Sequence, residues 1–143
     1  MKKITLVIIT SLFAFGLTAQ SNKEMLCKKW TIDVDALIAS VPEMAEMMKI
    51  MPDDQKALMK EKMGAVRVEF FKNGTMESSQ GDGGAVKNGT WEFIENGAAI
   101  KSITGEEQKE RIMEIVELSS DSMTVKERGK EKEPAMIMIP AVD

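Results

Sequence analysis

Residues 65–103 read AVRVEFFKNGTMESSQGDGGAVKNGTWEFIENGAAIKSI, and this stretch decides the fold class. Val66, Val68 and Phe70 occupy every second position, which is the period of a strand that buries one face. An Asn-Gly pair follows at positions 73–74. Because both residues tolerate positive φ, an Asn-Gly pair beside an alternating run predicts a type I′ hairpin turn. The stretch therefore begins with an antiparallel hairpin.

The same pattern continues along the chain. Asn-Gly pairs return at positions 88–89 and 96–97, and Trp91 and Phe93 lie on one face of the run between them. The strands that we expect span residues 26–34, 66–71, 75–80, 89–94, 98–103, 111–118, 123–126 and 135–139. The sixth does not alternate cleanly, which predicts a bulge or burial on both faces. Consecutive hairpins predict a mainly β fold, an up-and-down antiparallel β-barrel of about eight strands, with a sandwich as the alternative.

Residues 36–63 break the strand period and predict a helical insert after the first strand. Four methionines recur at the i, i+3, i+4, i+7 spacing of an amphipathic helix: Met44, Met47, Met48 and Met51. Ser40 would cap this helix, and Pro52 would separate it from a second helix that ends at Gly64. We expect these two helices, within residues 41–63, to pack over one end or flank of the barrel with the four methionines facing inward.

The N-terminus has the features of a secretory signal peptide. Lys2 and Lys3 precede an uncharged apolar run from Ile4 to Leu17, and Ala19 is a small residue suited to cleavage. The run is short for a membrane span, although an uncleaved anchor is the alternative. We therefore expect residues 1–19 to be removed and residues 20–143 to form one soluble domain in the periplasm or outside the cell.

Charge and residue usage exclude several classes of function. The formal net charge is −4, and loss of Lys2 and Lys3 would make it −6, which disfavours nucleic-acid and anionic membrane partners. The chain has no histidine, so Ser-His and Cys-His nucleophile pairs and most transition-metal sites are excluded. Cys27 is the only cysteine, and we expect it to be a buried small hydrophobe. We predict a protein that is not an enzyme, with no cofactor and no metal centre.

Methionine is the unusual feature of the composition. The chain has 13 methionines, and six of them lie between Met44 and Met63. Methionine fills irregular gaps in cores and also suits adaptable surfaces for ligands or partners. Thioethers are in addition soft ligands for Cu(I), so the Met-x-x-Met spacing raises metal binding as a third interpretation. The helical period of the methionines favours packing.

Trp30 on the first strand is followed by three short motifs: FKNGT at 71–75, GTW at 89–91 and IVELSSDSMTV at 115–125. Their order resembles that of the secreted bacterial lipocalin-like domains, and the resemblance covers residues 25–139. The chain departs from true lipocalins at Lys28, where they have glycine, and it offers no obvious arginine to close over Trp30. The resemblance implies a lipocalin-like barrel.

Barrel and resemblance together indicate a non-catalytic binding module for a small apolar ligand or a protein partner. The candidate ligand-binding residues line the barrel interior or a helical lid: Trp30, Phe70, Trp91, Phe93, Met44, Met47, Met48 and Met51. The alternative is a structural or interaction domain whose barrel is filled by its own side chains and holds no ligand.

Overall fold

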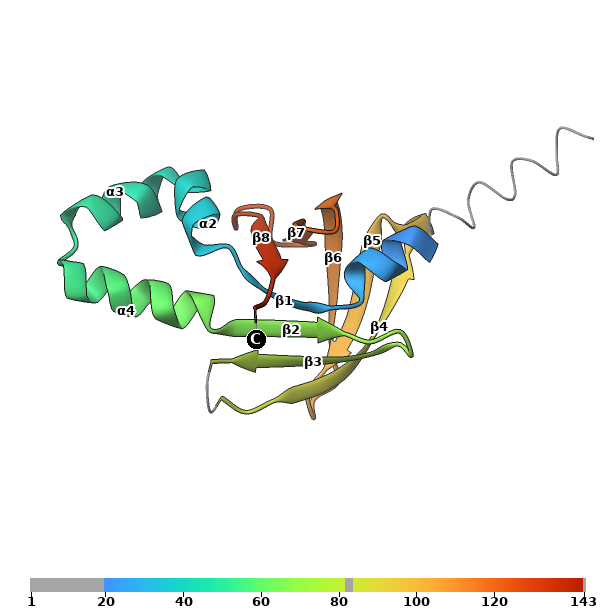
Figure 1. The fold of residues 1–143 in the computed structure, drawn as a ribbon. Coiled ribbons are helices and arrows are strands. Elements are labelled where there is room, and N and C mark those ends of the chain that lie inside the picture. The colour runs from blue at the N-terminus through green and yellow to red at the C-terminus, as the bar shows by residue number, and fades with distance from the viewer. Residues whose placement is uncertain (1–19, 82–83, 143) are drawn as a thin grey trace, which may run out of the picture.

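The computed structural model describes residues 20–81 and 84–142, so the predicted signal peptide at 1–19 lies outside the described residues. Eight antiparallel strands close into a barrel in which successive strands pair and β8 pairs with β1 (Figure 1). The strands are β1 (Lys29–Ile32), β2 (Val66–Phe70), β3 (Thr75–Gln80), β4 (Lys87–Ile94), β5 (Ala99–Thr104), β6 (Lys109–Leu118), β7 (Met123–Glu127) and β8 (Met136–Pro140). The prediction of a mainly β, up-and-down barrel is confirmed, and the sandwich alternative is wrong.

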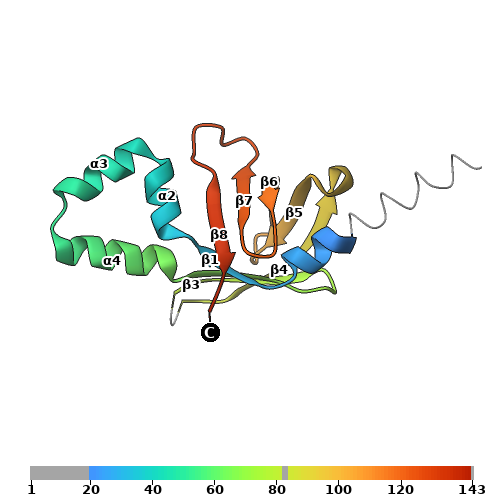
Figure 2. The same ribbon diagram turned by 45° about the horizontal axis from the view of Figure 1, so that its top comes forward.

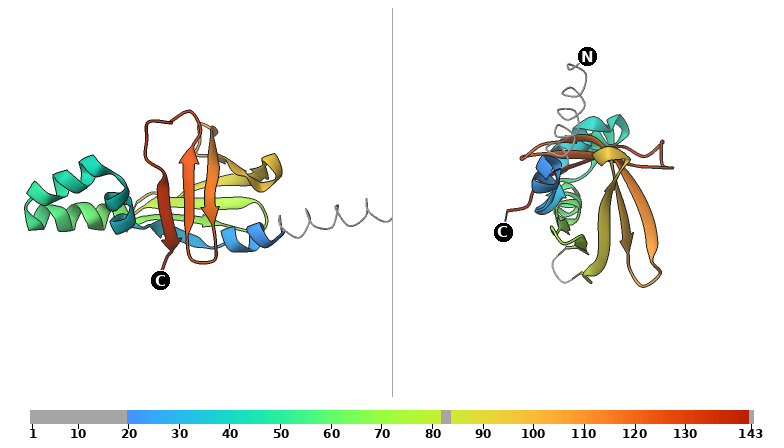
Figure 3. Two further views of the ribbon diagram at one scale, coloured as in Figure 1. Left: turned by 90° about the horizontal axis from the view of Figure 1, so that it is seen from above. Right: turned by 90° about the vertical axis from the view of Figure 1, so that its right-hand side faces the viewer.

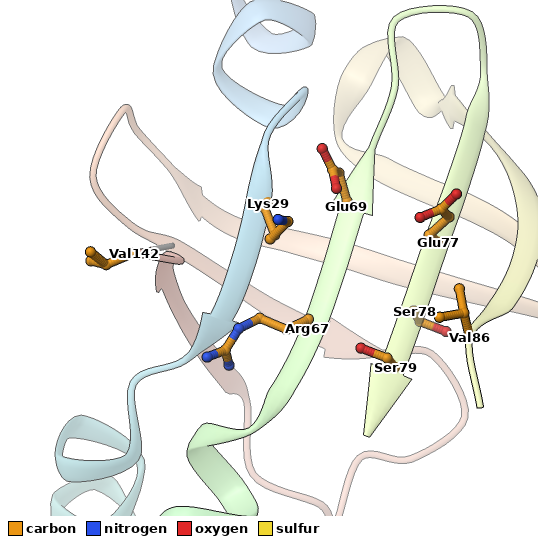
Figure 4. A pocket seen from close by; sticks show the side chains of 8 residues that line it. All are labelled: Lys29, Arg67, Glu69, Glu77, Ser78, Ser79, Val86 and Val142. Atoms are coloured by element: carbon orange, nitrogen blue, oxygen red, sulfur yellow. The ribbon is translucent and has the colours of Figure 1, made fainter. Parts of the chain in front are cut away.

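Side chains on the inner face of the barrel form one apolar core. Phe70 of β2 and Met76 of β3 are register partners and are both buried, while Arg67 and Glu69 project from the outer face (Figure 4). The core cluster consists of nine buried residues: Leu26, Trp30, Phe70, Met76, Trp91, Ile100, Met123, Val125 and Met138. Full burial of one large apolar side chain contributes roughly 1.5–3 kcal/mol, so this cluster is the main source of stability.

The irregular apolar pattern of β6 reflects a bulge, as predicted. The pairing of β6 with β7 shifts register between Ile115 and Glu117. Without the extra residue, Ile115 and Leu118 would lie on opposite faces of the strand. The bulge brings both side chains against the core, where they are partly buried.

The hairpin at positions 73–74 forms, but not with the predicted turn type. Gly74 has a φ of 86°, whereas Asn73 is not among the residues with positive φ, so the turn is not type I′. The Asn73 side chain instead accepts a hydrogen bond from the Thr75 backbone N–H at 3.0 Å. Asparagine is common at turns because it tolerates positive φ and because its side chain can accept a hydrogen bond from the backbone two residues later. Asn73 acts in the second way.

The other two Asn-Gly pairs behave differently from each other. Asn96 and Gly97 have φ angles of 58° and 86° and form the expected turn between β4 and β5. The pair at 88–89 lies inside β4, so the turn expected there is wrong. A Cβ atom on Gly89 would collide with the Ile103 carbonyl of β5, and glycine is therefore needed for close strand contact rather than for a turn.

The chain enters the barrel through a short helical segment, residues 20–26, and β1 begins only at Lys29. The expectation of a strand from Leu26 is therefore wrong. Leu26 is fully buried in the core, and its carbonyl accepts a hydrogen bond from the Trp30 indole N–H at 2.9 Å. The helical conformation at Leu26 buries its side chain and at the same time directs its carbonyl toward the Trp30 indole, four residues later in the chain.

Three helices between β1 and β2 form what we call the helical arm: α2 (Val34–Ser40), α3 (Pro42–Ile50) and α4 (Asp53–Gly64). The two predicted helices are present, and α2 is an additional one. Asp33 caps α2 by accepting the Ala36 N–H at 3.0 Å. Ser40 does not cap α3, because its hydroxyl donates to the Leu37 carbonyl at 2.8 Å and Val41 is the N-cap residue.

The helical arm extends away from the barrel, opposite the segment 20–26 (Figures 1, 2 and 3). α2 packs against β8 and α4 against β1, whereas α3 packs against α2. The expected cover over one end or flank of the barrel is therefore wrong for α3. Leu37 of α2 and Met48 of α3 are buried, and α4 has no buried residue.

Candidate functional site

The two ends of the barrel differ in how they are closed. At the end that we call the N-terminal end, the segment 20–26 lies across the strands and buries Leu26 completely. Lys28 then ties this segment to the turn between β6 and β7, because its Nζ donates to the Ser120 carbonyl at 2.8 Å. The opposite end, where the helical arm joins β1 and β2, we call the arm end.

The aromatic residues predicted to bind ligand belong to the packed core. Trp30, Phe70 and Trp91 are at most 6% exposed, and Phe93 is partly buried against them. Trp91 makes edge-to-face contacts with the Phe70 and Phe93 rings, at centroid distances of 5.6 and 5.4 Å. Its indole N–H donates to the Phe71 carbonyl at 3.0 Å. Trp91 thus contacts the other two rings, and all of these aromatic side chains belong to the core or pack against it.

A lysine lies over each tryptophan at the N-terminal end. The Lys28 ammonium is 5.4 Å from the centroid of the Trp30 ring, and Lys23 is 5.9 Å from that of Trp91. Both distances fall within the range of cation–π attraction. Lys28, the residue that departs from the lipocalin pattern, thus provides the cation over Trp30.

The arm end contains a groove of about 660 Å³ between α4 and the ends of three strands. Its lining comes from β1, α4, β2 and the end of β3: Ile32, Glu61, Lys62, Met63, Ala65, Val66, Gln80 and Gly81. Ile32, Met63 and Val66 make it largely apolar, while Glu61 and Lys62 bring charge from the last turns of α4. The volume lies within the roughly 300–1,000 Å³ typical of small-molecule sites.

Arg67 fixes the wall of this groove to the barrel. Its guanidinium donates to the Thr31 hydroxyl at 2.6 Å, to the Val66 carbonyl at 3.0 Å and to the Gly64 carbonyl at the end of α4. Thr31 also donates to the Gly64 carbonyl, at 2.9 Å. The last carbonyls of a helix have no partner within the helix, so these bonds satisfy one of them and hold α4 against β1.

The four methionines predicted to face inward differ in burial; three of them belong to α3, and Met51 is its C-cap residue. Met48 is 9% exposed and buried in the arm, whereas Met47 is 42% exposed, and Met44 and Met51 are intermediate. The prediction that all four face inward is therefore wrong for Met47. The methionine that lines the groove is Met63 of α4, and none of the four methionines predicted to form the lid is among the lining residues.

A second groove, of about 370 Å³, lies on the outer face of β1–β3 (Figure 4). Lys29 and Arg67 line it together with Glu69 and Glu77, which are register partners on adjacent strands. Its mixed charges are suited to hydration rather than to an apolar ligand. We therefore place the candidate site in the groove at the arm end.

Two further features bear on chemistry: possible metal ligands and the thiol of Cys27. Within residues 20–81 and 84–142, no three His, Cys, Asp or Glu side chains come close enough together to hold a metal ion. Burial raises the pKa of the Cys27 thiol, against the opposing charges of Lys23 and Lys72. A raised pKa disfavours the thiolate, which is the reactive form of a cysteine.

Most residues of the groove were not predicted from the sequence. Ile32, Met63 and Val66 were assigned to strands or to a helix stripe, but nothing local showed that they meet. The Gly64 boundary was the available signal, because a helix that ends directly before a strand must place its last turn beside that strand's first residues.

Comparisons with protein-family models, curated proteins and solved structures found no match. In the part of the chain that the structure describes, no helix has the length and apolar character needed to cross a membrane.

Proposed function

We propose that this protein is an exported, lipocalin-like binding module without catalytic activity, and that it holds a small apolar ligand in the groove at the arm end. The observation that carries the proposal is the contrast between the two barrel ends. The N-terminal end is filled by Leu26, Trp30 and Trp91, whereas the arm end has a largely apolar groove of about 660 Å³. Apolar concave sites with a few polar groups at their edge are the usual form of ligand sites.

A titration with an apolar fluorescent probe such as 1-aminoanthracene tests this site. Met63→Glu places a charge in the groove, and we expect it to lower probe affinity about tenfold or more because the carboxylate must be desolvated. Leu58→Glu is the matched control, since Leu58 lies on the same helix and is 51% exposed. Equal affinities for the two variants and the parent would place the probe elsewhere.

The alternative function is a structural or interaction domain with no ligand. Its support is the tight core of nine buried side chains inside the barrel. Native mass spectrometry of protein exported by a bacterial host separates the two functions. A retained small molecule supports the binding module, whereas a bare protein that also fails to bind apolar probes supports the structural domain.

Export itself rests on the sequence of residues 1–19. The intact mass of the exported protein should correspond to a chain that begins at Gln20. A mass that includes residues 1–19 would contradict signal-peptide cleavage.

A further inference from the structure

Side chains that oxidants attack are few in this chain, and most of them are methionines. The chain has no tyrosine and no histidine, two tryptophans, one cysteine and 13 methionines. Trp30 and Trp91 are at most 6% exposed, and burial raises the pKa of the Cys27 thiol, which disfavours its reactive form. Oxidation of the folded protein therefore falls mainly on methionine thioethers.

The methionines of the barrel core and those of the helical arm differ in their exposure. Met76, Met123 and Met138, on three strands of the barrel, are at most 4% exposed. Every methionine of α3 and α4 is more exposed than these three, from Met48 at 9% to Met47 at 42%. A small oxidant in solution thus reaches the thioethers of the arm before those of the barrel core.

Met48 is the residue at which oxidation would change how the arm packs. α3 packs against α2, and the buried side chains of these two helices are Met48 and Leu37. A methionine sulfoxide is polar, and burial of a polar group without a hydrogen-bond partner is costly. Because so few buried side chains hold the two helices together, a sulfoxide at Met48 favours an arrangement in which α3 has left α2.

The position of α3 also gives an oxidant a route to Met48. α3 lies farther out along the arm than α2, as seen from the barrel (Figure 1). Short helices with few buried contacts open locally at low free energy, and each opening exposes the Met48 thioether. Met47, the preceding residue, is already 42% exposed and needs no such opening. Its oxidation measures the supply of oxidant, whereas oxidation of Met48 also measures the opening of the arm.

We propose that Met48 is a reversible oxidation site, and that its conversion to the sulfoxide by hydrogen peroxide releases α3 from α2. The thioether sulfur donates an electron pair to one peroxide oxygen, so that an S–O bond forms and the O–O bond breaks. The other oxygen leaves as hydroxide and takes up the proton of the first, which gives water. Sulfur is thereby oxidised and the peroxide reduced. A methionine sulfoxide reductase with a dithiol as reductant reverses the step and yields water and a disulfide.

The effect of this oxidation is confined to the arm. Arg67 and Thr31 both donate to the Gly64 carbonyl, so they hold the end of α4 against the barrel whether or not α3 is released. The three core methionines of the barrel are protected by the closed sheet. The oxidation site goes beyond the proposed function, because its consequence is measured on α3 and requires no ligand in the groove.

Peptide mapping by mass spectrometry after treatment with hydrogen peroxide, together with amide hydrogen exchange, tests the site. We expect Met47 to be oxidised first and Met48 second, both well before Met76, Met123 and Met138. Exchange in α3 should accelerate about tenfold or more once Met48 is oxidised, while exchange in β2–β6 stays unchanged. Treatment with methionine sulfoxide reductase should restore slow exchange. Oxidation of the barrel methionines as fast as Met48, or unchanged exchange in α3 after Met48 is oxidised, would overturn the proposal.

Two substitutions at position 48 separate loss of the sulfur from gain of polarity. Met48→Leu nearly conserves volume, so α3 should exchange slowly and peroxide should no longer accelerate it, although Met47 is still oxidised. Met48→Gln introduces a polar side chain of similar length, and it should accelerate exchange in α3 without any oxidant. An undiminished peroxide response in Met48→Leu, or slow exchange in Met48→Gln, would show that Met48 is not the sensitive residue.

Met136→Leu is the matched control. Met136 is 40% exposed, close to the value for Met47, but it lies on β8 of the barrel. The variant lacks one accessible thioether, and we expect α3 to respond to peroxide as in the parent. Loss of the response in Met136→Leu would place the sensitive thioether on the barrel and contradict a site in the arm.

Discussion

The barrel and the helical arm bury their apolar side chains to different degrees. In the barrel, Trp30 and Ile100 are fully buried and Phe70 is 2% exposed. In the arm, the buried residues are Leu37 and Met48, and α4 contains none across its 12 residues. A closed barrel encloses the inner face of every strand, whereas the arm's helices have only each other and a narrow joint with the barrel.

This difference separates a rigid part of the molecule from a part that can open by itself. Short helices are marginal in water and depend on packing of an apolar face. Regions with few buried apolar contacts open locally at a lower free energy than the whole domain. The groove at the arm end lies at the boundary, with one wall from the barrel and another from α4.

The largest effect that we predict is on the barrel side of this comparison. Trp91→Ala should cost roughly 3–5 kcal/mol, because it removes a buried ring that contacts both Phe70 and Phe93. Glu92→Ala changes the next residue of the same strand, which is exposed, and should be nearly silent. Urea unfolding of both variants measures the difference. Similar costs would mean that the assigned inner face of β4 is incorrect.

The second prediction compares the loss of stability when a buried methionine is truncated in the barrel and in the arm. Met76 is 4% exposed in the barrel core and Met48 is 9% exposed in the arm. Met76→Ala should cost about 2–5 kcal/mol of global stability, whereas Met48→Ala should cost less than half of that, because the arm can open without unfolding the barrel. Urea midpoints compare the two, and equal losses would show that arm and barrel unfold as one unit.

Arg67 offers a third test, at the joint between the two regions. Arg67→Met removes the bonds to Thr31 and to the Gly64 carbonyl, and we expect a loss of roughly 1–3 kcal/mol. Amide hydrogen exchange should accelerate in α4 and stay unchanged in β4–β6. Arg128→Met is the control, since Arg128 pairs with Glu95 and Glu114 on the exposed surface. Uniform acceleration throughout the chain would contradict a local role for Arg67.

The smallest effect concerns Met47 on the exposed side of α3. Met47→Leu should change stability by only a few tenths of a kcal/mol, because the residue is 42% exposed and the swap nearly conserves volume. It should also leave any Cu(I) uptake unaltered, because we interpret the methionines as packing residues rather than metal ligands. Competition with a Cu(I) chelator measures this. Tight copper binding that disappears in Met47→Leu would restore the metal interpretation of the methionine stripe.

The barrel could be predicted because its signals are local. Alternation of Val66, Val68 and Phe70 identifies a strand and its buried face without knowledge of its partner. The irregular apolar residues of β6 likewise predicted a bulge that the pairing with β7 shows. The barrel is closed by the pairing of the first strand with the last, for example of Thr31 with Ile139. These residues are far apart in the chain, and the closure was inferred from the number of strands alone.

The errors concern residues whose role depends on a distant neighbour. Gly89 sits beside an asparagine like a turn residue, but the nearby Ile103 carbonyl is what requires glycine there. Leu26 fits the alternation of a strand in the sequence. In the structure its carbonyl accepts a hydrogen bond from the Trp30 indole N–H, and the sequence pattern does not show that bond. The methionine stripe shows that α3 has a buried face, but it cannot show whether that face meets the barrel or another helix.

The groove was beyond local patterns for the same reason. Ile32, Met63 and Val66 meet only because α4 ends directly at the start of β2.

The position of the arm in the chain has a consequence for how this protein can change over evolutionary time. β1 and β2 are neighbours in the sheet, and Thr31 both pairs with Arg67 and donates to the Gly64 carbonyl at 2.9 Å, so the chain leaves and re-enters the barrel at one place. A turn of about two to five residues could make the same connection. The arm is therefore an insertion between two neighbouring strands. Related chains could lengthen, shorten or replace it without moving a strand of the barrel, and each such change would alter the groove.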